Sequence, residues 1–180
     1  MHHVGAERFL NYIYFKMENA GLRTLQEAEP MLPGQKTERE GNFVDTDFIN
    51  LTAENLAHEH LCCIIRSKKP HPGIEAKRQW LSERLKEGHV FRKLNEKAVV
   101  FIEYAPLETA WVPILGDNYY YLYCLWVSGS YKGKGYGKAL MEYCLADARE
   151  KGKSGVCMLG AKKQKSWLSD QSFAKKYGFE

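Results

Sequence analysis

Glycines and lysines alternate in one short segment of the chain, and this spacing suits the binding of an anion. The segment contains Lys132, Gly133, Lys134, Gly135, Gly137 and Lys138. Glycine lets a ligand approach the backbone, because no side chain stands in the way. An apolar run precedes the segment and an amphipathic run follows it, so the turn should lead from a strand into the N-terminus of a helix. The first N–H groups of a helix lack partners within it and attract phosphate. The segment therefore predicts a pyrophosphate site.

Two common phosphate-binding motifs do not match this segment. A Walker loop requires Ser or Thr after its Gly-Lys pair, but Ala139 follows Lys138. A dinucleotide-binding fingerprint requires a small residue where Lys138 or Leu140 stands, depending on the glycine from which it is counted. The alternative to a binding site is a glycine turn that serves only to start the helix.

Glu103 is the clearest candidate for acid–base chemistry outside the turn. It stands between apolar residues of a segment with strand character. A carboxylate in that setting could act as a base through a water molecule, with its pKa raised by burial. The alternative is that Glu103 faces solvent on the other side of the strand. Cys124 could be a nucleophile, but no His stands near it in the sequence, and a core position is favoured.

Metal and nucleic acid binding are not expected. On a helix, His58 and Cys62 would share a face while His60 points away, and the sequence offers no matching ligands elsewhere. The tyrosines between positions 119 and 123 could stack on bases, but the chain has neither a basic stripe nor an RNA-binding motif. These rings are better explained as part of the hydrophobic core or as the lining of a substrate pocket.

Length and composition predict one globular domain in a reducing cytoplasm. The 180 residues carry a formal net charge of +4, and 44% of them are hydrophobic. No apolar run approaches the roughly 20 residues that cross a bilayer, and the N-terminus lacks the pattern of a secretory signal. The five cysteines include no C-x-x-C pair, so neither a redox motif nor a zinc knuckle is indicated.

The order of predicted elements indicates an α/β fold. Helices are expected at 9–17, 53–63, 75–87 and 136–151, and strands at 90–91, 98–104, 110–115, 119–127 and 155–159. The strand at 119–127 is apolar on both faces and should be central. Strand, helix and strand from 119 to 159 imply a parallel crossover, whereas short turns join the earlier strands. We expect a mixed, largely antiparallel sheet with helices on both faces, in three layers.

The segment from Lys132 to Gly137 resembles motif A of the GNAT acetyltransferases, whose pattern is Arg/Gln-x-x-Gly-x-Gly/Ala. Lysine replaces the usual first residue. The end of the chain, with Gly178 and Phe179, resembles the Gly-Phe that closes a late helix in this family. From Phe48 onward the sequence is similar in particular to the YoaP-type subgroup. The resemblance covers residues 48–180, and we assign residues 46–180 to the GNAT domain and 1–45 to an extension of unknown role.

The resemblance implies a cytoplasmic N-acetyltransferase that uses acetyl-CoA. Trp126 and Val127 would offer backbone groups to the pantetheine and thioester. The pyrophosphate would bind backbone N–H groups of Lys132, Gly133, Lys134, Gly135, Tyr136, Gly137 and Lys138. A primary amine of a small molecule or protein would attack the thioester directly. No metal is expected, and nothing points to a membrane or nucleic acid partner.

The sequence departs from the family pattern near its end. Ala174 stands where many members carry a Tyr that acts as general acid, and Trp167 stands where an Asn is frequent. Tyr177 is a nearby candidate for the acid, with a core or surface aromatic as the alternative. This departure keeps a second function open, namely a non-catalytic acyl-CoA-binding or sensing module.

The sheet is expected to lack the last two strands of the family, because the sequence ends at Glu180. On that expectation the GNAT domain is C-terminally incomplete and its sheet has an open edge that needs a partner. Such an edge would suit a homodimer. A partner strand from residues 1–45 would refute this expectation.

Overall fold

The computed structural model of the protein describes residues 13–18, 48–63, 71–97, 99–162 and 169–180. Within them, seven strands form one sheet in the order β1-β6-β5-β4-β3-β2, with β7 paired to β6. The strands are β1 (Ile13–Glu18), β2 (Phe48–Asn50), β3 (Val90–Leu94), β4 (Val100–Pro106), β5 (Tyr119–Val127), β6 (Gly155–Ala161) and β7 (Ser169–Asp170). β6 runs parallel to β5 and β7, and the other neighbours are antiparallel. The expected mixed, largely antiparallel sheet is confirmed.

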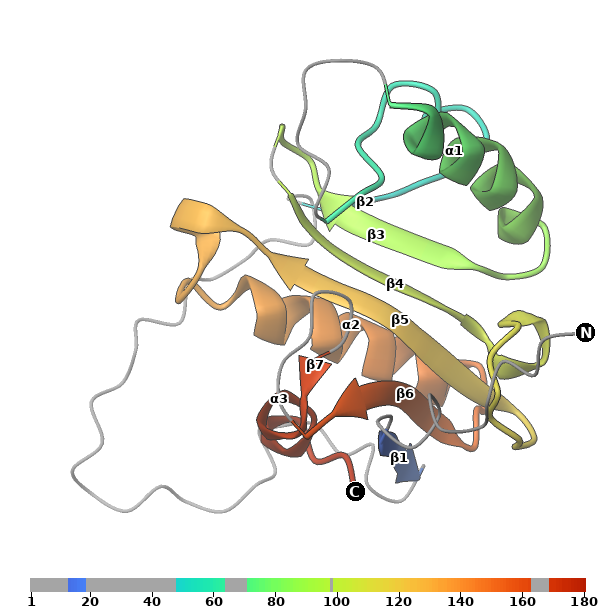
Figure 1. Ribbon diagram of the computed structural model, residues 1–180, viewed down its shortest axis with the longest axis vertical. Helices are drawn as coiled ribbons and strands as arrows, with labels where there is room; N and C mark the ends of the chain where they lie inside the picture. The colour runs from blue at the N-terminus through green and yellow to red at the C-terminus, as the bar shows by residue number, and fades with distance from the viewer. Residues whose placement is uncertain (1–12, 19–47, 64–70, 98, 163–168) are drawn as a thin grey trace, which may run out of the picture.

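Helices lie on both faces of this sheet (Figure 1). The helix α1 (Pro72–Leu85) covers one face, and α2 (Tyr136–Glu150) covers the other together with the short α3 (Gln171–Lys176). The expected three layers are therefore present. None of the helices that the structure describes is long and apolar enough to cross a membrane.

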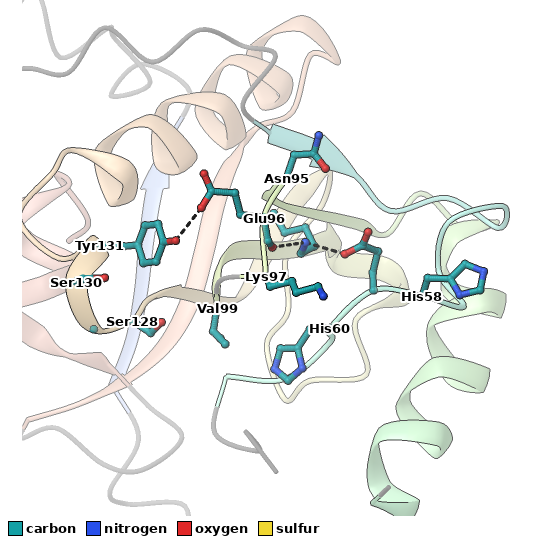
Figure 2. Close-up of a pocket in the computed structure, with 12 residues that line it drawn as sticks. His58, His60, Asn95, Glu96, Lys97, Val99, Ser128, Ser130 and Tyr131 are labelled. Atoms are coloured by element: carbon teal, nitrogen blue, oxygen red, sulfur yellow. Dashed lines mark hydrogen bonds and ion pairs between the residues drawn. The ribbon is translucent and has the colours of Figure 1, made fainter. Parts of the chain in front are cut away.

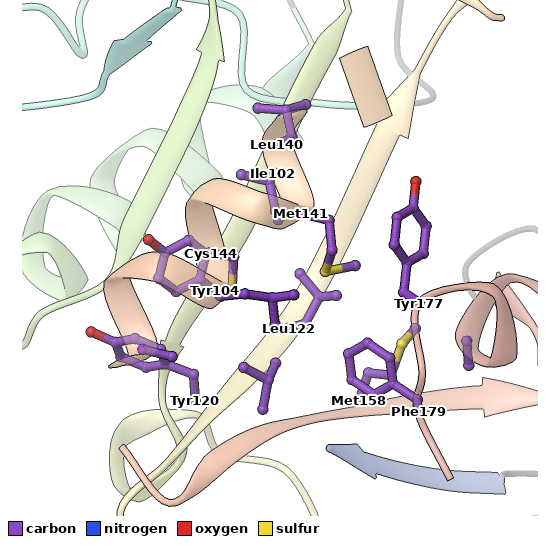
Figure 3. Close-up of a cluster of buried hydrophobic side chains, with 14 of the residues drawn as sticks. Ile102, Tyr104, Tyr120, Leu122, Leu140, Met141, Cys144, Met158, Tyr177 and Phe179 are labelled. Atoms are coloured by element: carbon purple, nitrogen blue, oxygen red, sulfur yellow. The ribbon is translucent and has the colours of Figure 1, made fainter. Parts of the chain in front are cut away.

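The larger core fills the space between α2 and the sheet (Figure 3). The helix contributes its buried stripe, which consists of Leu140, Met141, Cys144, Leu145 and Ala148. These are the residues that helical periodicity predicts, because they recur on one face. They pack against Tyr104 of β4 and Leu122 of β5. The hydroxyl of Tyr104 donates to Asp147 Oδ2 at 2.9 Å, which fixes α2 to the middle of the sheet.

Several predicted elements occur close to their expected bounds. β5 begins and ends where the apolar run predicts it, and β6 continues two residues past the expected end at Leu159. The helix expected at 75–87 occurs at 72–85. It begins early because Pro72 suits the first helical position and His71 caps the helix, with Gly73 N donating to His71 Nδ1 at 3.0 Å.

The prediction of a helix at 53–63 is wrong, since these residues form turns and irregular backbone. Leu56 N donates to Thr52 O at 3.0 Å, which is helical spacing, but His58 N donates to Asn55 O at 3.1 Å, so the four-residue spacing does not continue. The side chain of Asn55 bonds the preceding backbone: its Oδ1 accepts from Thr52 N at 2.9 Å, and its Nδ2 donates to Asn50 O at 3.0 Å.

The prediction of a strand at 110–115 is also wrong. A short 3₁₀ helix, η4 (Leu107–Thr109), stands before it, and the residues that follow form bends. Trp111 has a φ of +55°, which is incompatible with an extended strand. Pro113 lacks the N–H that a strand ladder needs.

The segment around Phe15 is a strand and not the expected helix. β1 pairs antiparallel with β6 from Ile13–Gly160 to Glu18–Gly155, whereas residues 9–12 lie outside the described part of the chain. Isoleucine and aromatic residues favour strands where a partner is present, and the outer edge of β6 supplies that partner. The edge of β6 is therefore covered, and the expectation of an open edge there is refuted. No strand follows α3 within the described residues.

Candidate cofactor site

The glycine-rich segment links the end of β5 to the start of α2. It begins with a short 3₁₀ helix, η5 (Gly129–Tyr131). Gly133 and Gly135 follow with φ values of +74° and +85°, which disfavour any residue with a Cβ atom. Gly135 is the N-cap of α2, and no side chain forms a cap hydrogen bond there. An anionic ligand can therefore take the capping role at this helix end.

The parallel strands β5 and β6 separate as they approach this turn. They pair only from Tyr119–Gly155 to Tyr121–Cys157. β5 then continues to Val127, while the end of β6 pairs with β7 at Gly160 (Figure 1). Among the described residues, the far half of β5 thus has no strand partner on its β6 side. That half can bind an extended arm through its backbone, as the resemblance predicts for pantetheine.

A β-bulge interrupts β5 in this separated half. Glu103 of β4 pairs with Cys124, but the next residue, Tyr104, pairs with Leu122. Tyr123 is therefore the extra residue, and bulges turn consecutive side chains toward the same face. Tyr123 lies against the rings of Trp80 and His89, and Cys124 packs against the cluster beneath α1.

Trp126 and Val127 lie where β5 meets the turn. Within the described residues, the Trp126 indole Nε1 is buried and has no hydrogen-bond partner. The Trp126 ring packs against the cluster beneath α1. Val127 Cγ2 would lie 3.7 Å from a Cβ atom on Gly137, so β5 and α2 approach closely here.

The charges around the turn suit a polyphosphate. Lys132 and Lys134 are exposed, and Lys134 Nζ lies 5.8 Å from the ring centroid of Tyr131. The Tyr131 ring also meets the Tyr136 ring edge to face at 5.6 Å. The uncapped helix end, the unpaired half of β5 and these lysines fit coenzyme A.

The hydroxyl of Tyr177, the residue after α3, lies close to the first turn of α2. Its side chain lies in the core beneath α2, and its hydroxyl oxygen would be 3.4 Å from a Cβ atom on Gly137 (Figure 3). Burial, and then the charge of Glu142, raise the pKa of Tyr177 above its ordinary value. The hydroxyl therefore stays protonated at neutral pH and is a possible proton donor at the start of α2. Ala174 is fully buried in the same core.

Glu103 is buried in an ion-paired network on the α1 face. Its Oε2 accepts from Lys77 Nζ at 2.6 Å, and its Oε1 lies 3.1 Å from His89 Nε2. Burial by itself raises the pKa of Glu103, but the bonds and charges of His89 and Lys77 outweigh it, and the pKa lies below its ordinary value. The expectation of a raised pKa is therefore wrong. Lys77 and His89 are far from Glu103 in the sequence, and no sequence pattern predicted this network.

A cavity of about 680 Å³ opens beside the start of the glycine-rich segment (Figure 2). Its lining comes from the turns after β2, from β3 and the β3–β4 turn, and from Ser128 and η5 after β5: His58, Glu59, His60, Lys93, Asn95, Glu96, Lys97, Val99, Ser128, Gly129, Ser130 and Tyr131. Lys93 Nζ donates to Glu59 Oε2 at 2.7 Å, and the Tyr131 hydroxyl donates to Glu96 Oε2 at 2.7 Å. The described part of the chain has no group of three or more His, Cys, Asp or Glu residues arranged to hold a metal.

Comparisons with known proteins agree with this geometry. The profile described as "Acetyltransferase (GNAT) family" matches residues 53–179. The chain therefore belongs to the GNAT acetyltransferase family. It is 42% identical over 132 residues to the uncharacterized N-acetyltransferase YoaP of Bacillus subtilis (strain 168), a match that covers 73% of this chain and 53% of that protein. The chain thus spans about half the length of this curated relative.

A solved structure of similar shape is a functionally unknown conserved protein from Staphylococcus epidermidis ATCC 12228. The two share 11% sequence identity with a TM-score of 0.49, over 96% of this chain and 60% of the other.

Proposed function

We propose that this chain transfers an acetyl group from acetyl-CoA to a primary amine by direct attack, without an acetylated enzyme intermediate. The observation that carries the proposal is the separation of β5 from β6 next to the uncapped start of α2. Membership of the GNAT family supports the same reaction class. The co-substrate supplies an activated thioester carbonyl, and the chain supplies its binding and orientation.

Each part of the site has a separate task in this proposal. The backbone from Lys132 to Lys138 holds the pyrophosphate, and the unpaired half of β5 up to Trp126 and Val127 holds the arm that carries the thioester. A backbone N–H at the end of β5 would stabilise negative charge on the carbonyl oxygen. Fixing both reactants on one rigid strand lowers the entropic part of the barrier.

Proton transfer is assigned to Tyr177 and Glu103. Tyr177 would donate to the departing thiolate, because burial keeps its hydroxyl protonated. Glu103 would accept the proton that leaves the amine, and its contact with His89 offers a route onward. Because the carboxylate is only 4% exposed, we expect it to act through water or through His89.

The acceptor is proposed to enter through the cavity beside Ser128. This cavity is lined by Ser128, the residue that follows β5, and the thioester would lie at the end of that strand. Its lining carries both signs of charge, since Glu59 pairs with Lys93 and Glu96 accepts from Tyr131, so it offers polar contacts to an acceptor.

A steady-state assay tests the proposal. The chain is incubated with acetyl-CoA and a panel of amines, and release of coenzyme A is recorded. Direct attack predicts intersecting initial-rate lines, whereas parallel lines would indicate an acetylated enzyme. Gly135→Asp should abolish turnover, because a carboxylate at the α2 N-cap repels pyrophosphate. Gly152→Asp is the matched control, since Gly152 also has a positive φ, +61°, but lies beyond the other end of α2.

A second function is favoured by one observation. Ala174 is buried at the position where many family members carry the Tyr that acts as general acid. This substitution suits a module that binds acyl-CoA without transferring the acyl group. Saturable acetyl-CoA binding with no turnover of any amine would support this alternative over the enzyme.

A further inference from the structure

The ammonium group of Lys77 is held against the carboxylate of Glu103 on the α1 face of the sheet. Lys77 belongs to α1, and its Nζ donates to Glu103 Oε2 at 2.6 Å. The same nitrogen lies 5.2 Å from the centroid of the Phe91 ring. The side chain of Glu103 is only 5% exposed, whereas that of Lys77 is 25% exposed. A primary amine of the chain itself thus contacts the carboxylate that is assigned to deprotonate the acceptor.

This contact lies on the same face of the sheet as the side chains at the end of β5. Glu103 of β4 is paired with Cys124 of β5, and Phe101 is paired with Trp126. The side chains of Phe101, Cys124 and Trp126 pack in the cluster beneath α1, the helix that carries Lys77. Two residues along a strand span about 7 Å, so Glu103 stands about that far along the sheet from the pair at Trp126. The flexible four-carbon stem of lysine can turn its amine from Glu103 toward the end of β5.

We propose that Lys77 is an internal acceptor, which the chain acetylates with its own bound acetyl-CoA; this modification site rests on the function proposed above. Glu103 accepts one proton from the Lys77 ammonium, and the lone pair on Nζ attacks the carbonyl carbon of the thioester. A C–N bond forms, and the C–S bond breaks with its electron pair on sulfur. The nitrogen releases its second proton and the coenzyme A thiolate takes one up. The products are acetylated Lys77, free coenzyme A and one proton on Glu103.

The burial of Glu103 lowers the cost of the first proton transfer. An ion pair that is removed from water carries a desolvation cost for both of its charges. Transfer of one proton from Lys77 to Glu103 converts the pair into a neutral amine and a carboxylic acid, which do not carry that cost. The neutral amine is the form of a lysine that can attack a thioester, so the buried carboxylate both holds Lys77 and activates it.

Two other lysines that pair with carboxylates serve as references. Lys86, directly after α1, pairs with Glu83 at 2.9 Å, and their side chains are 70% and 59% exposed. Lys86 should therefore be the easier target for acetylation that needs no enzyme. Lys93 is buried, but its Nζ donates to two acceptors, at 2.7 and 3.2 Å. Within the described residues Lys77 donates to one acceptor, so its amine is released more easily.

Mass spectrometry of peptides from the full chain tests this site. The protein is incubated with acetyl-CoA and no added amine, and acetylation is followed at Lys77, Lys86 and Lys93. Lys77 should react at least about tenfold faster than the more exposed Lys86, because its amine and the donor are held in one site. Excess coenzyme A should suppress the reaction at Lys77 alone, and acetyl phosphate, which has no coenzyme A moiety, should reverse the preference. The rate at Lys77 should not depend on protein concentration.

Substitution of the two carboxylates gives a matched pair of variants. Glu103→Gln should slow acetylation of Lys77 by about 100-fold and leave Lys86 unchanged, whereas Glu83→Gln should leave Lys77 unchanged. The competition by coenzyme A uses the unaltered chain, so it decides the question even if Glu103→Gln fails to fold.

Several outcomes would overturn the proposal: equal rates at Lys77 and Lys86, a preference for Lys93, a rate at Lys77 that rises with protein concentration, or one that coenzyme A does not reduce. Turnover of an added amine without acetylation of Lys77 would also overturn it, while the proposed function would stand. Acetylated Lys77 without turnover of any added amine would support this site and count against the proposed external acceptor.

Discussion

A Cβ atom on Gly137 would lie 3.4 Å from the hydroxyl oxygen of Tyr177. This relationship joins the first turn of α2 to the residue that follows α3, at the place where β5 and β6 have separated. The binding turn and the candidate proton donor therefore meet, although forty residues separate them in the sequence. Substitutions at this meeting point can distinguish cofactor binding from proton transfer.

Gly135 and Gly137 of the turn differ in backbone conformation, so replacing each by alanine should change stability in opposite directions. Gly137 lies inside α2, where an added methyl group would make only ordinary contacts, so Gly137→Ala should raise the free energy of unfolding by about 0.5–1 kcal/mol. Gly135 has a φ of +85°, so Gly135→Ala should lower the free energy of unfolding by roughly 1–2 kcal/mol. Urea unfolding measures both. If both variants changed the free energy of unfolding in the same direction, the backbone conformations assigned to Gly135 and Gly137 would be contradicted.

Exposed lysines should contribute to the affinity for acetyl-CoA. Replacing Lys132 and Lys134 together by alanine should weaken binding about tenfold at low salt, since each exposed charge contributes up to about 1 kcal/mol. The loss should shrink as salt is added. Lys151→Ala is the control, because Lys151 pairs with Asp147 near the other end of α2. Calorimetry that finds equal affinities for the double variant and the parent would exclude a role for these charges.

Tyr177→Phe tests proton donation while it preserves the ring in the core. If Tyr177 protonates the departing thiolate, kcat should fall by about 100-fold or more, and the Kd for acetyl-CoA should stay unchanged. Tyr120→Phe, which alters another buried tyrosine of the same core, should leave kcat within a few-fold of the parent. An unchanged kcat in Tyr177→Phe would restrict this residue to packing.

The Glu103 network should make stability depend on pH. The pKa of Glu103 is lowered by folding from an ordinary value of 4.5, so its stabilising effect is complete above that pH and is lost as the pH falls below it. Glu103→Gln should lower the free energy of unfolding by about 2 kcal/mol at neutral pH, because it leaves His89 and Lys77 without their carboxylate partner.

Urea unfolding from neutral pH down to acid measures this effect. The difference between parent and Glu103→Gln should shrink as the carboxylate of the parent becomes protonated. A difference that is constant across this range would mean that ionisation of Glu103 contributes nothing. The pH profile of kcat, compared between the same two proteins, separates a catalytic role from a structural one.

Local patterns predicted the elements that hold the cofactor site. β5 is apolar on both faces, α2 repeats its apolar residues every three or four positions, and the glycines between them are needed for their backbone angles. Each of these features depends on residues that are neighbours in the sequence. The resemblance to GNAT motif A depended on the same short segment, and the family match confirms it.

Errors arose where distant segments supply the partner. Residues 13–18 form a strand because β6 offers an edge to pair with, and no residue within that segment indicates β6. The helix predicted at 53–63 is an error with a local cause, because the four-residue spacing from Leu56 N to Thr52 O gives way to a three-residue spacing from His58 N to Asn55 O. Periodicity counts apolar residues and does not detect where the backbone hydrogen bonds of a helix stop.

The sequence by itself determined the family, the central strand and the anion-binding turn, because these follow from local backbone requirements and from hydrophobic spacing. Only the tertiary structure decided what surrounds the reacting groups. It placed Glu103 between Lys77 and His89 and brought the hydroxyl of Tyr177 to Gly137. The pKa of each of these groups depends on charges and burial contributed by other elements, so it could not be obtained before the chain was folded.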